Sequence, residues 1–121
     1  MAERIPVLVV TDPERSAEFM TDVLGMRVVS GAPEWVFGLG QEKIRLVAAT
    51  RVDLDLGQPV EAGSTACRVL ATNIGLLHER CELHDVVVAK RHLRRTRWGT
   101  DEFTIEDPDG NRVTFWSVSV T

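Results

Sequence analysis

Apolar positions follow two different periods along this chain, and the same succession occurs twice. Residues 5–10 are almost continuously apolar, and residues 13–24 carry an apolar stripe at helical spacing. A short run of branched apolar residues is typical of a strand covered on both faces, and such a stripe is typical of an amphipathic helix. Residues 65–71 and 73–81 repeat this order. The pattern predicts two βα units of similar construction.

Both predicted helices have recognisable start signals. Asp12 precedes Pro13, so a good N-cap residue is followed by the residue type best suited to the first helical position. Gly25 follows the last apolar position, Leu24, and is expected to end the first helix. Asn73 stands before the second helix as Asp12 stands before the first.

Three strand patterns follow each helix. They cover residues 26–30, 35–39 and 43–48 in the first half, and residues 86–88, 98–106 and 111–116 in the second. Asp107-Pro108-Asp109-Gly110 separates the last two with the residues of a type I turn. We therefore predict one α+β domain over residues 1–121, with βαβββ modules at 1–49 and 64–121 and a linker at 50–63. Two curved sheets then surround a concave cavity, with the helices on the convex side.

Composition narrows the class of protein. The chain has 121 residues and a formal charge of −4, which argues against nucleic acid as a general partner. The basic run at 90–97 is interpreted as a solvated loop. No apolar run approaches the roughly 20 residues of a membrane span, and the N-terminus lacks the features of a signal peptide. The two cysteines lack metal-site spacing, so we expect reduced thiols in a cytoplasmic protein.

Two segments resemble a known family. Residues 8–12 with 15–26 resemble the first βα unit of the vicinal oxygen chelate superfamily, which includes glyoxalase, bleomycin resistance proteins and extradiol dioxygenases. Trp98-Gly99 with residues 103–111 resembles the closing hairpin of that superfamily. The resemblance covers nearly the whole chain. It implies paired βαβββ modules, usually in a dimer, and it leaves the function open because the same fold serves metalloenzymes and metal-free binders.

The resemblance also indicates where metal ligands stand in the enzymes of that superfamily, which use His, Gln or Glu. The corresponding positions here hold Ile5, Arg45, Ala66 and Thr114, with the register around Arg45 uncertain by one residue. None is a usual ligand of a divalent metal, and an arginine repels a cation. Exposed positions without a ligand role are expected for the histidines, His78, His84 and His92. We therefore expect no metal and no cofactor at the usual site.

Without that metal, the resemblance is closest to the bleomycin-resistance branch, whose members bind a small molecule between aromatic side chains in a cavity formed with a dimer partner. Strand alternation and position suggest the walls of such a cavity. The candidate ligand-binding residues are Trp35, Phe37, Arg45, Arg68, Trp98, Glu102, Thr114 and Trp116. Each tryptophan could instead belong to the core or to a dimer interface. Each arginine could pair with an acid of this chain, such as Glu102 or Glu106.

The leading hypothesis is a homodimeric, metal-free protein that sequesters a planar or aromatic drug, such as an antibiotic. One alternative is a metal-dependent lyase, isomerase or dioxygenase of the same superfamily, and another is a metabolite-binding accessory or sensor domain. We predict no catalytic residue, because Glu102 or Glu106 could serve as an acid or base but neither has a partner at matching spacing.

Overall fold

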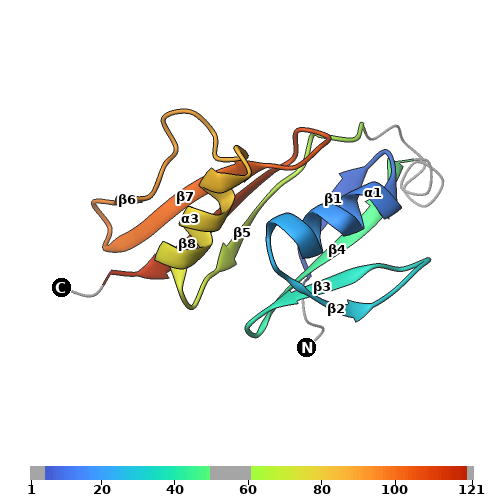
Figure 1. Cartoon of the computed structure of the whole chain (residues 1–121), viewed down its shortest axis with the longest axis horizontal. Helices are drawn as coiled ribbons and strands as arrows, with labels where there is room; N and C mark the ends of the chain where they lie inside the picture. Colours follow the sequence, from blue (N-terminus) through green and yellow to red (C-terminus); the bar gives the residue numbers. More distant parts are fainter. Residues whose placement is uncertain (1–4, 50–60, 120–121) are drawn as a thin grey trace.

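A computed structural model describes residues 5–49 and 61–119, and Figure 1 shows two sheets lying side by side. The first module contains β1 (Val7–Val10), α1 (Pro13–Glu18), the π-helical turn η1 (Phe19–Val23), β2 (Arg27–Ser30), β3 (Val36–Leu39) and β4 (Glu42–Ala48). The second contains β5 (Ala66–Leu70), α3 (Ile74–Leu83), β6 (Arg94–Arg95), β7 (Thr100–Glu106) and β8 (Arg112–Val118). Most of the linker predicted at 50–63 lies outside the described residues.

The two modules have the same topology. Their strand orders are β1-β4-β3-β2 and β5-β8-β7-β6. In each, the first strand pairs in parallel with the last, and the other pairings are antiparallel. The helices cover one side of both sheets (Figure 1). The predicted α+β fold of two repeated modules is therefore confirmed. We call the opposite side of each sheet its open face.

The core lies between the sheets and the helices. Phe37 and Ile44 of the first sheet, and Phe103 and Phe115 of the second, have no exposed surface. Residues that alternate with these point to the open face, as strand geometry requires. Within the described residues, no helix combines the length and apolar character needed to cross a membrane.

The first helix begins and ends where the sequence predicts. The Asp12 carboxylate accepts hydrogen bonds from the backbone N–H groups of Glu14 and Arg15, and Pro13 takes the first helical position. Gly25 follows η1 with a φ of +68°, a conformation that glycine adopts without strain. Asn73 does precede α3, but its side chain makes no capping hydrogen bond.

The second module departs from the prediction at residues 86–88. Val87 forms only an isolated bridge to Ile105, and the strand beside β7 is the two-residue β6. Val87 pairs with Ile105, and Arg94 pairs with Glu102. The two paired positions are therefore seven residues apart on this side but only three residues apart on β7. The excess chain forms a bulge at residues 89–93, where Lys90 has a φ of +67°. Such a residue interrupts an extended strand, so the strand predicted at 86–88 is reduced to the bridge at Val87, and β6 forms within the basic run that was interpreted as a loop.

The turn between β7 and β8 joins the two modules. Asn111 is fully buried, and its amide donates hydrogen bonds to the Val9 carbonyl and the Asp107 carboxylate, both at 2.8 Å. Its side-chain oxygen accepts a hydrogen bond from the Thr65 backbone N–H at 3.0 Å. Burial raises the pKa of Asp107, although bonds from Asn111 oppose that shift. One amide therefore links β1 to the beginning of β5 and to the hairpin.

Arg80 of α3 makes a second link between modules. Its guanidinium donates to the carbonyls of Val23 at 2.7 Å and Asp22 at 2.8 Å, which lie at the C-terminal end of η1. A cation is favourable there because those carbonyls lack helical partners.

Replacing Arg80 by methionine is expected to lower the free energy of unfolding by about 1 kcal/mol, because two charge-assisted hydrogen bonds are lost. Urea denaturation measures this difference. Arg97→Met is the control, since Arg97 is exposed and makes no ion pair within residues 5–49 and 61–119. Equal losses in the two variants would contradict the proposed link.

Candidate functional site

A buried carboxylate lies at the centre of the open face of the second sheet. Glu102 of β7 is only 3% exposed, and its side chain forms a two-point ion pair with Arg68 of β5. The two N–O distances are 3.1 and 2.8 Å. The guanidinium also lies 5.8 Å from the ring centre of Trp116 on β8, within the range of a cation–π contact. Three strands thus contribute to one cluster.

Two further donors hold the same carboxylate. The Thr100 hydroxyl donates to Glu102 Oε2 at 2.7 Å, and the indole Nε1–H of Trp98 donates to it at 3.2 Å. Trp98 nevertheless remains 67% exposed. Its ring is therefore oriented by a hydrogen bond while most of its surface faces solvent.

The ion pair determines the charge of this cluster. Hydrogen bonding to Arg68 lowers the pKa of Glu102 to about 2, with smaller contributions from Thr100 and Trp98 and an opposing effect of burial. The same hydrogen bond raises the pKa of Arg68. Both groups are charged at neutral pH and cancel one another. The alternative in which an arginine pairs with an acid of this chain therefore applies to Arg68.

The structure brings together five of the eight predicted ligand-binding residues. These are Arg68, Trp98, Glu102, Thr114 and Trp116, all on or beside the open face of the second sheet. Thr114 lies opposite Arg68 in the strand register and shares a hydrogen bond of 2.9 Å with Thr104.

The other three residues lie in the first module. Phe37 is fully buried in the core and has no exposed surface for a ligand, and Trp35 stacks on it at 5.8 Å. Both rings lie on the core side because the open-face position of β3 is Val36, which pairs with Arg45. Arg45 itself is exposed on the open face of the first sheet and has no ion-pair partner in the described part of the chain.

Comparison with known proteins identifies the family. Residues 5–115 match the sequence model of the Glyoxalase/Bleomycin resistance protein/Dioxygenase superfamily. The chain belongs to this superfamily. No curated protein matches it.

Solved structures of the superfamily fold are similar over nearly the whole chain. An integron cassette protein from the mobile metagenome of V. cholerae is 26% identical, with a TM-score of 0.70 and coverage of 98% of both chains. TioX from Micromonospora sp. ML1 is 16% identical, with a TM-score of 0.75 and coverage of 99% of this chain and 98% of that one. Lactoylglutathione lyase from Agrobacterium tumefaciens is 20% identical, with a TM-score of 0.73 and coverage of 96% and 92%. At their identities, the last two comparisons show the fold alone.

The residues at the superfamily's usual metal positions do not fit a metal. The four positions hold an alkyl side chain, a guanidinium, a methyl group and a hydroxyl, namely Ile5, Arg45, Ala66 and Thr114. The Thr114 hydroxyl is engaged with Thr104, and Arg45 carries a positive charge. A divalent ion needs several imidazole or carboxylate groups around one point.

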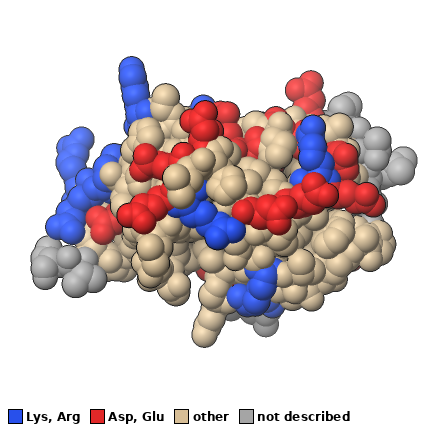
Figure 2. All heavy atoms as spheres, viewed as in Figure 1, with Lys and Arg blue, Asp and Glu red and all other residues tan. Residues whose placement is uncertain are grey.

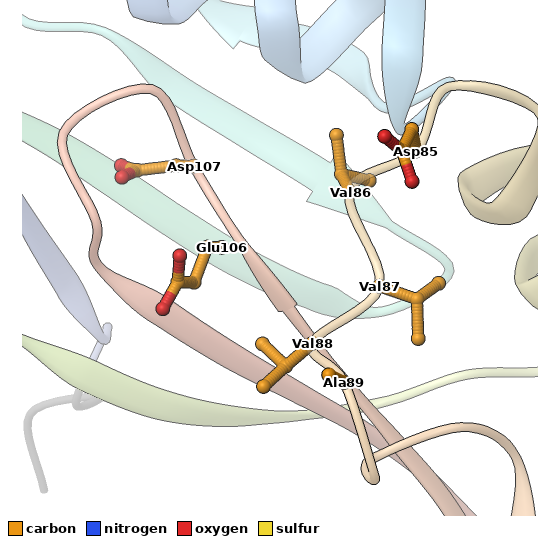
Figure 3. Close-up of a pocket in the computed structure, with 7 residues that line it drawn as sticks. All are labelled: Asp85, Val86, Val87, Val88, Ala89, Glu106 and Asp107. Atoms are coloured by element: carbon orange, nitrogen blue, oxygen red, sulfur yellow. The ribbon is translucent and has the colours of Figure 1, made fainter.

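A separate shallow pocket lies between the segment 85–89 and the end of β7. Figure 3 shows its lining of Asp85, three valines and Ala89 on one side and Glu106 and Asp107 on the other. Its volume is about 370 Å³. Glu106 pairs with Arg112, and Asp107 is held by Asn111. The pocket contains no predicted ligand-binding residue. The carboxylates of Glu106 and Asp107, at the end of β7, are already bound to other side chains of the fold.

Thr100 and Arg94 lie at the cluster but were not among the predicted residues, and His78 lies elsewhere than predicted. Thr100 lies two positions before Glu102, so strand alternation alone could have assigned it to the same face. Arg94 faces Glu102 across β6 and β7, but the bulge concealed this register. His78 was expected to be exposed, whereas its side chain is only 12% exposed and packs against the Phe103 ring.

Proposed function

We propose that this protein sequesters a small planar organic molecule, of the drug or antibiotic type, without chemical conversion. The observation that carries the proposal is the cluster of Trp98 and Trp116 around the Arg68–Glu102 ion pair. An indole that is both exposed and held by a hydrogen bond offers a flat contact surface with little orientational freedom left to lose. The fixed orientation of Trp98 therefore favours stacking with a planar ligand.

Charge suggests what such a ligand carries. Because the Glu102 carboxylate neutralises the Arg68 guanidinium, a ligand that binds this cluster needs no charge of its own. Arg45 on the first sheet offers a guanidinium that suits a carboxylate, phosphate or other polar oxygen. Figure 2 shows Lys and Arg side chains at the end of the molecule where Figure 1 places β6. A planar molecule with an anionic or polar oxygen substituent is the best match.

The open faces need a cover to become a closed cavity. Leu70 and Val118, near the cluster, are 38% and 66% exposed. We propose that a second copy of the chain covers these faces, forming a homodimer that excludes water from the stacked ligand. Sedimentation of the purified protein tests this part, and a monomer at working concentration would contradict it.

Tryptophan fluorescence tests the binding function. The chain has three tryptophans, so Trp35→Phe leaves only Trp98 and Trp116 as reporters. Titration of that variant with glycopeptide, enediyne and quinone antibiotics should produce saturable quenching by a planar compound. Adding Trp116→Leu to it should weaken binding about tenfold or more, because truncating a stacked tryptophan commonly costs over 1 kcal/mol.

The control for the titration is Trp35→Phe itself, whose affinity should equal that of the wild type by calorimetry because Trp35 lies on the core side. Absence of quenching by every planar compound, or full affinity after Trp116→Leu, would contradict the proposal. Conversion of the compound during titration would favour the enzyme alternative.

A further inference from the structure

A His–Glu pair stands on the surface of α3, on the opposite side of the second sheet from the tryptophan cluster. His78 and Glu82 are four residues apart and therefore share one helix face. His78 Nδ1 lies 3.0 Å from Glu82 Oε1. The His78 ring also contacts the fully buried Phe103 ring edge-on, at 5.0 Å between centres. That contact fixes the imidazole plane before any ligand arrives.

The bulge at residues 89–93 brings a third group to this pair. Arg91 of the bulge still contacts β7, since the Thr104 N–H donates to its carbonyl at 3.0 Å, and the residues after it turn towards α3. His92 consequently lies beside His78, with ring centres 5.7 Å apart, and the Leu93 backbone N–H donates to His78 Nε2 at 3.2 Å. One ligand atom from each of His78, Glu82 and His92 lies within 4.8 Å of the other two. No other group of three such residues occurs in residues 5–49 and 61–119.

We propose that His78, Glu82 and His92 bind a divalent first-row transition metal, with Zn²⁺ as the reference ion. Two imidazoles and one carboxylate are ligand types that Zn²⁺ prefers, and water fills the remaining positions. Zinc–nitrogen bonds of about 2.0 Å place tetrahedral ligands about 3.3 Å apart. The His78–Glu82 separation is already close to that value, and His92 must approach by rotation of an exposed side chain.

Metal binding through Nδ1, the nitrogen beside Glu82, replaces both hydrogen bonds that His78 makes here. In the structure both ring nitrogens of His78 are engaged, one by Glu82 and the other by the Leu93 N–H. A neutral imidazole that accepts from Leu93 carries its proton on Nδ1, so coordination through either nitrogen breaks the Leu93 bond. That bond is long, and its loss moderates the affinity without preventing binding. The bound metal would then connect the bulge at residues 89–93, through His92, to α3.

Calorimetric titration of the chelator-treated full-length protein with Zn²⁺ tests this site. We expect saturable binding of equimolar Zn²⁺ by the wild type and a loss of more than about tenfold in affinity for His92→Gln. His92 is exposed, so this variant should fold as the wild type does. His84→Gln is the matched control, because His84 is exposed and lies outside the group of three.

Co²⁺ provides an independent readout of the ligands. Its visible absorption in the wild type should indicate nitrogen and oxygen ligands without a thiolate charge-transfer band, and His92→Gln should lose this spectrum. Equal Zn²⁺ affinity in His92→Gln and the wild type, absence of saturable binding, or a thiolate band from Cys67 or Cys81 would each overturn the proposal. The Trp35→Phe antibiotic titration is independent of this site, since the two lie on opposite faces of the second sheet.

Discussion

Replacing Asn111 by alanine is expected to destabilise the protein by about 3 kcal/mol or more. The side chain has no exposed surface and joins three segments that are far apart in the sequence. Its removal leaves the Thr65 N–H and one oxygen of Asp107 without their partner, and the Val9 carbonyl keeps only the Gly63 N–H at 3.2 Å. Each buried polar group left unsatisfied costs about 1–3 kcal/mol.

Urea denaturation followed by far-ultraviolet circular dichroism measures this loss. Asn73→Ala is the matched control, because Asn73 is exposed and makes no capping hydrogen bond, and it should change stability by less than about 0.5 kcal/mol. A loss below 1 kcal/mol for Asn111→Ala would show that the junction between modules does not depend on this amide.

Much of the fold could be predicted from the sequence because its determinants are local. The cap at Asp12, the glycine after η1 and the turn at residues 107–110 each act within a few residues. The repeated order of elements then fixed the pairing of the modules. The junction at Asn111 was not predicted, since its partner Val9 lies 102 positions away and no local pattern reports such a contact.

The short strand β6, at residues 94–95, also escaped prediction. Val86 to Val88 has the composition of a strand, but a bulge replaces regular pairing after it. The bulge depends on a positive φ at Lys90, a residue whose side chain gives no sign of that conformation. His92 is exposed in a loop, as the sequence predicts, but the sequence did not indicate that its ring lies 5.7 Å from that of His78 on α3.

The candidate site was predicted where strand alternation applied. The alternation of β7 and β8 correctly put Glu102, Thr114 and Trp116 on one face, and the sequence allowed for an Arg–Glu pair. Alternation does not indicate which face of β3 the helices cover. Phe37 was therefore predicted to line a cavity, whereas it lies in the core. Burial, unlike periodicity, depends on the element that packs from another part of the chain.

Replacing Arg68 by methionine is expected to lower stability at neutral pH and to change its dependence on pH. Without Arg68, the buried Glu102 carboxylate keeps only the Thr100 and Trp98 donors. The lowering of the Glu102 pKa from 4.5 to about 2 corresponds to at most about 3 kcal/mol. Since the Arg68 side chain is 51% exposed, solvent screens part of the interaction, and we expect a loss of about 1–2 kcal/mol.

The sign of the pH effect follows from the direction of the shift. A carboxylate whose pKa is lower in the folded state stabilises the fold above its unfolded pKa, and this contribution disappears as the pH falls through the folded pKa. The difference in unfolding free energy between wild type and Arg68→Met should therefore be constant near pH 7 and shrink from about pH 4.5 towards pH 2.

Urea denaturation at pH 7, 4 and 3 measures this difference, and the double variant Arg68→Met/Glu102→Gln is the control. Removing both charges leaves no unpaired buried carboxylate, so the double variant should recover part of the lost stability and show a weaker dependence on pH. A pH-independent loss in Arg68→Met would mean that the guanidinium acts through packing on Trp116, and the ion pair would then not set the charge of the cluster.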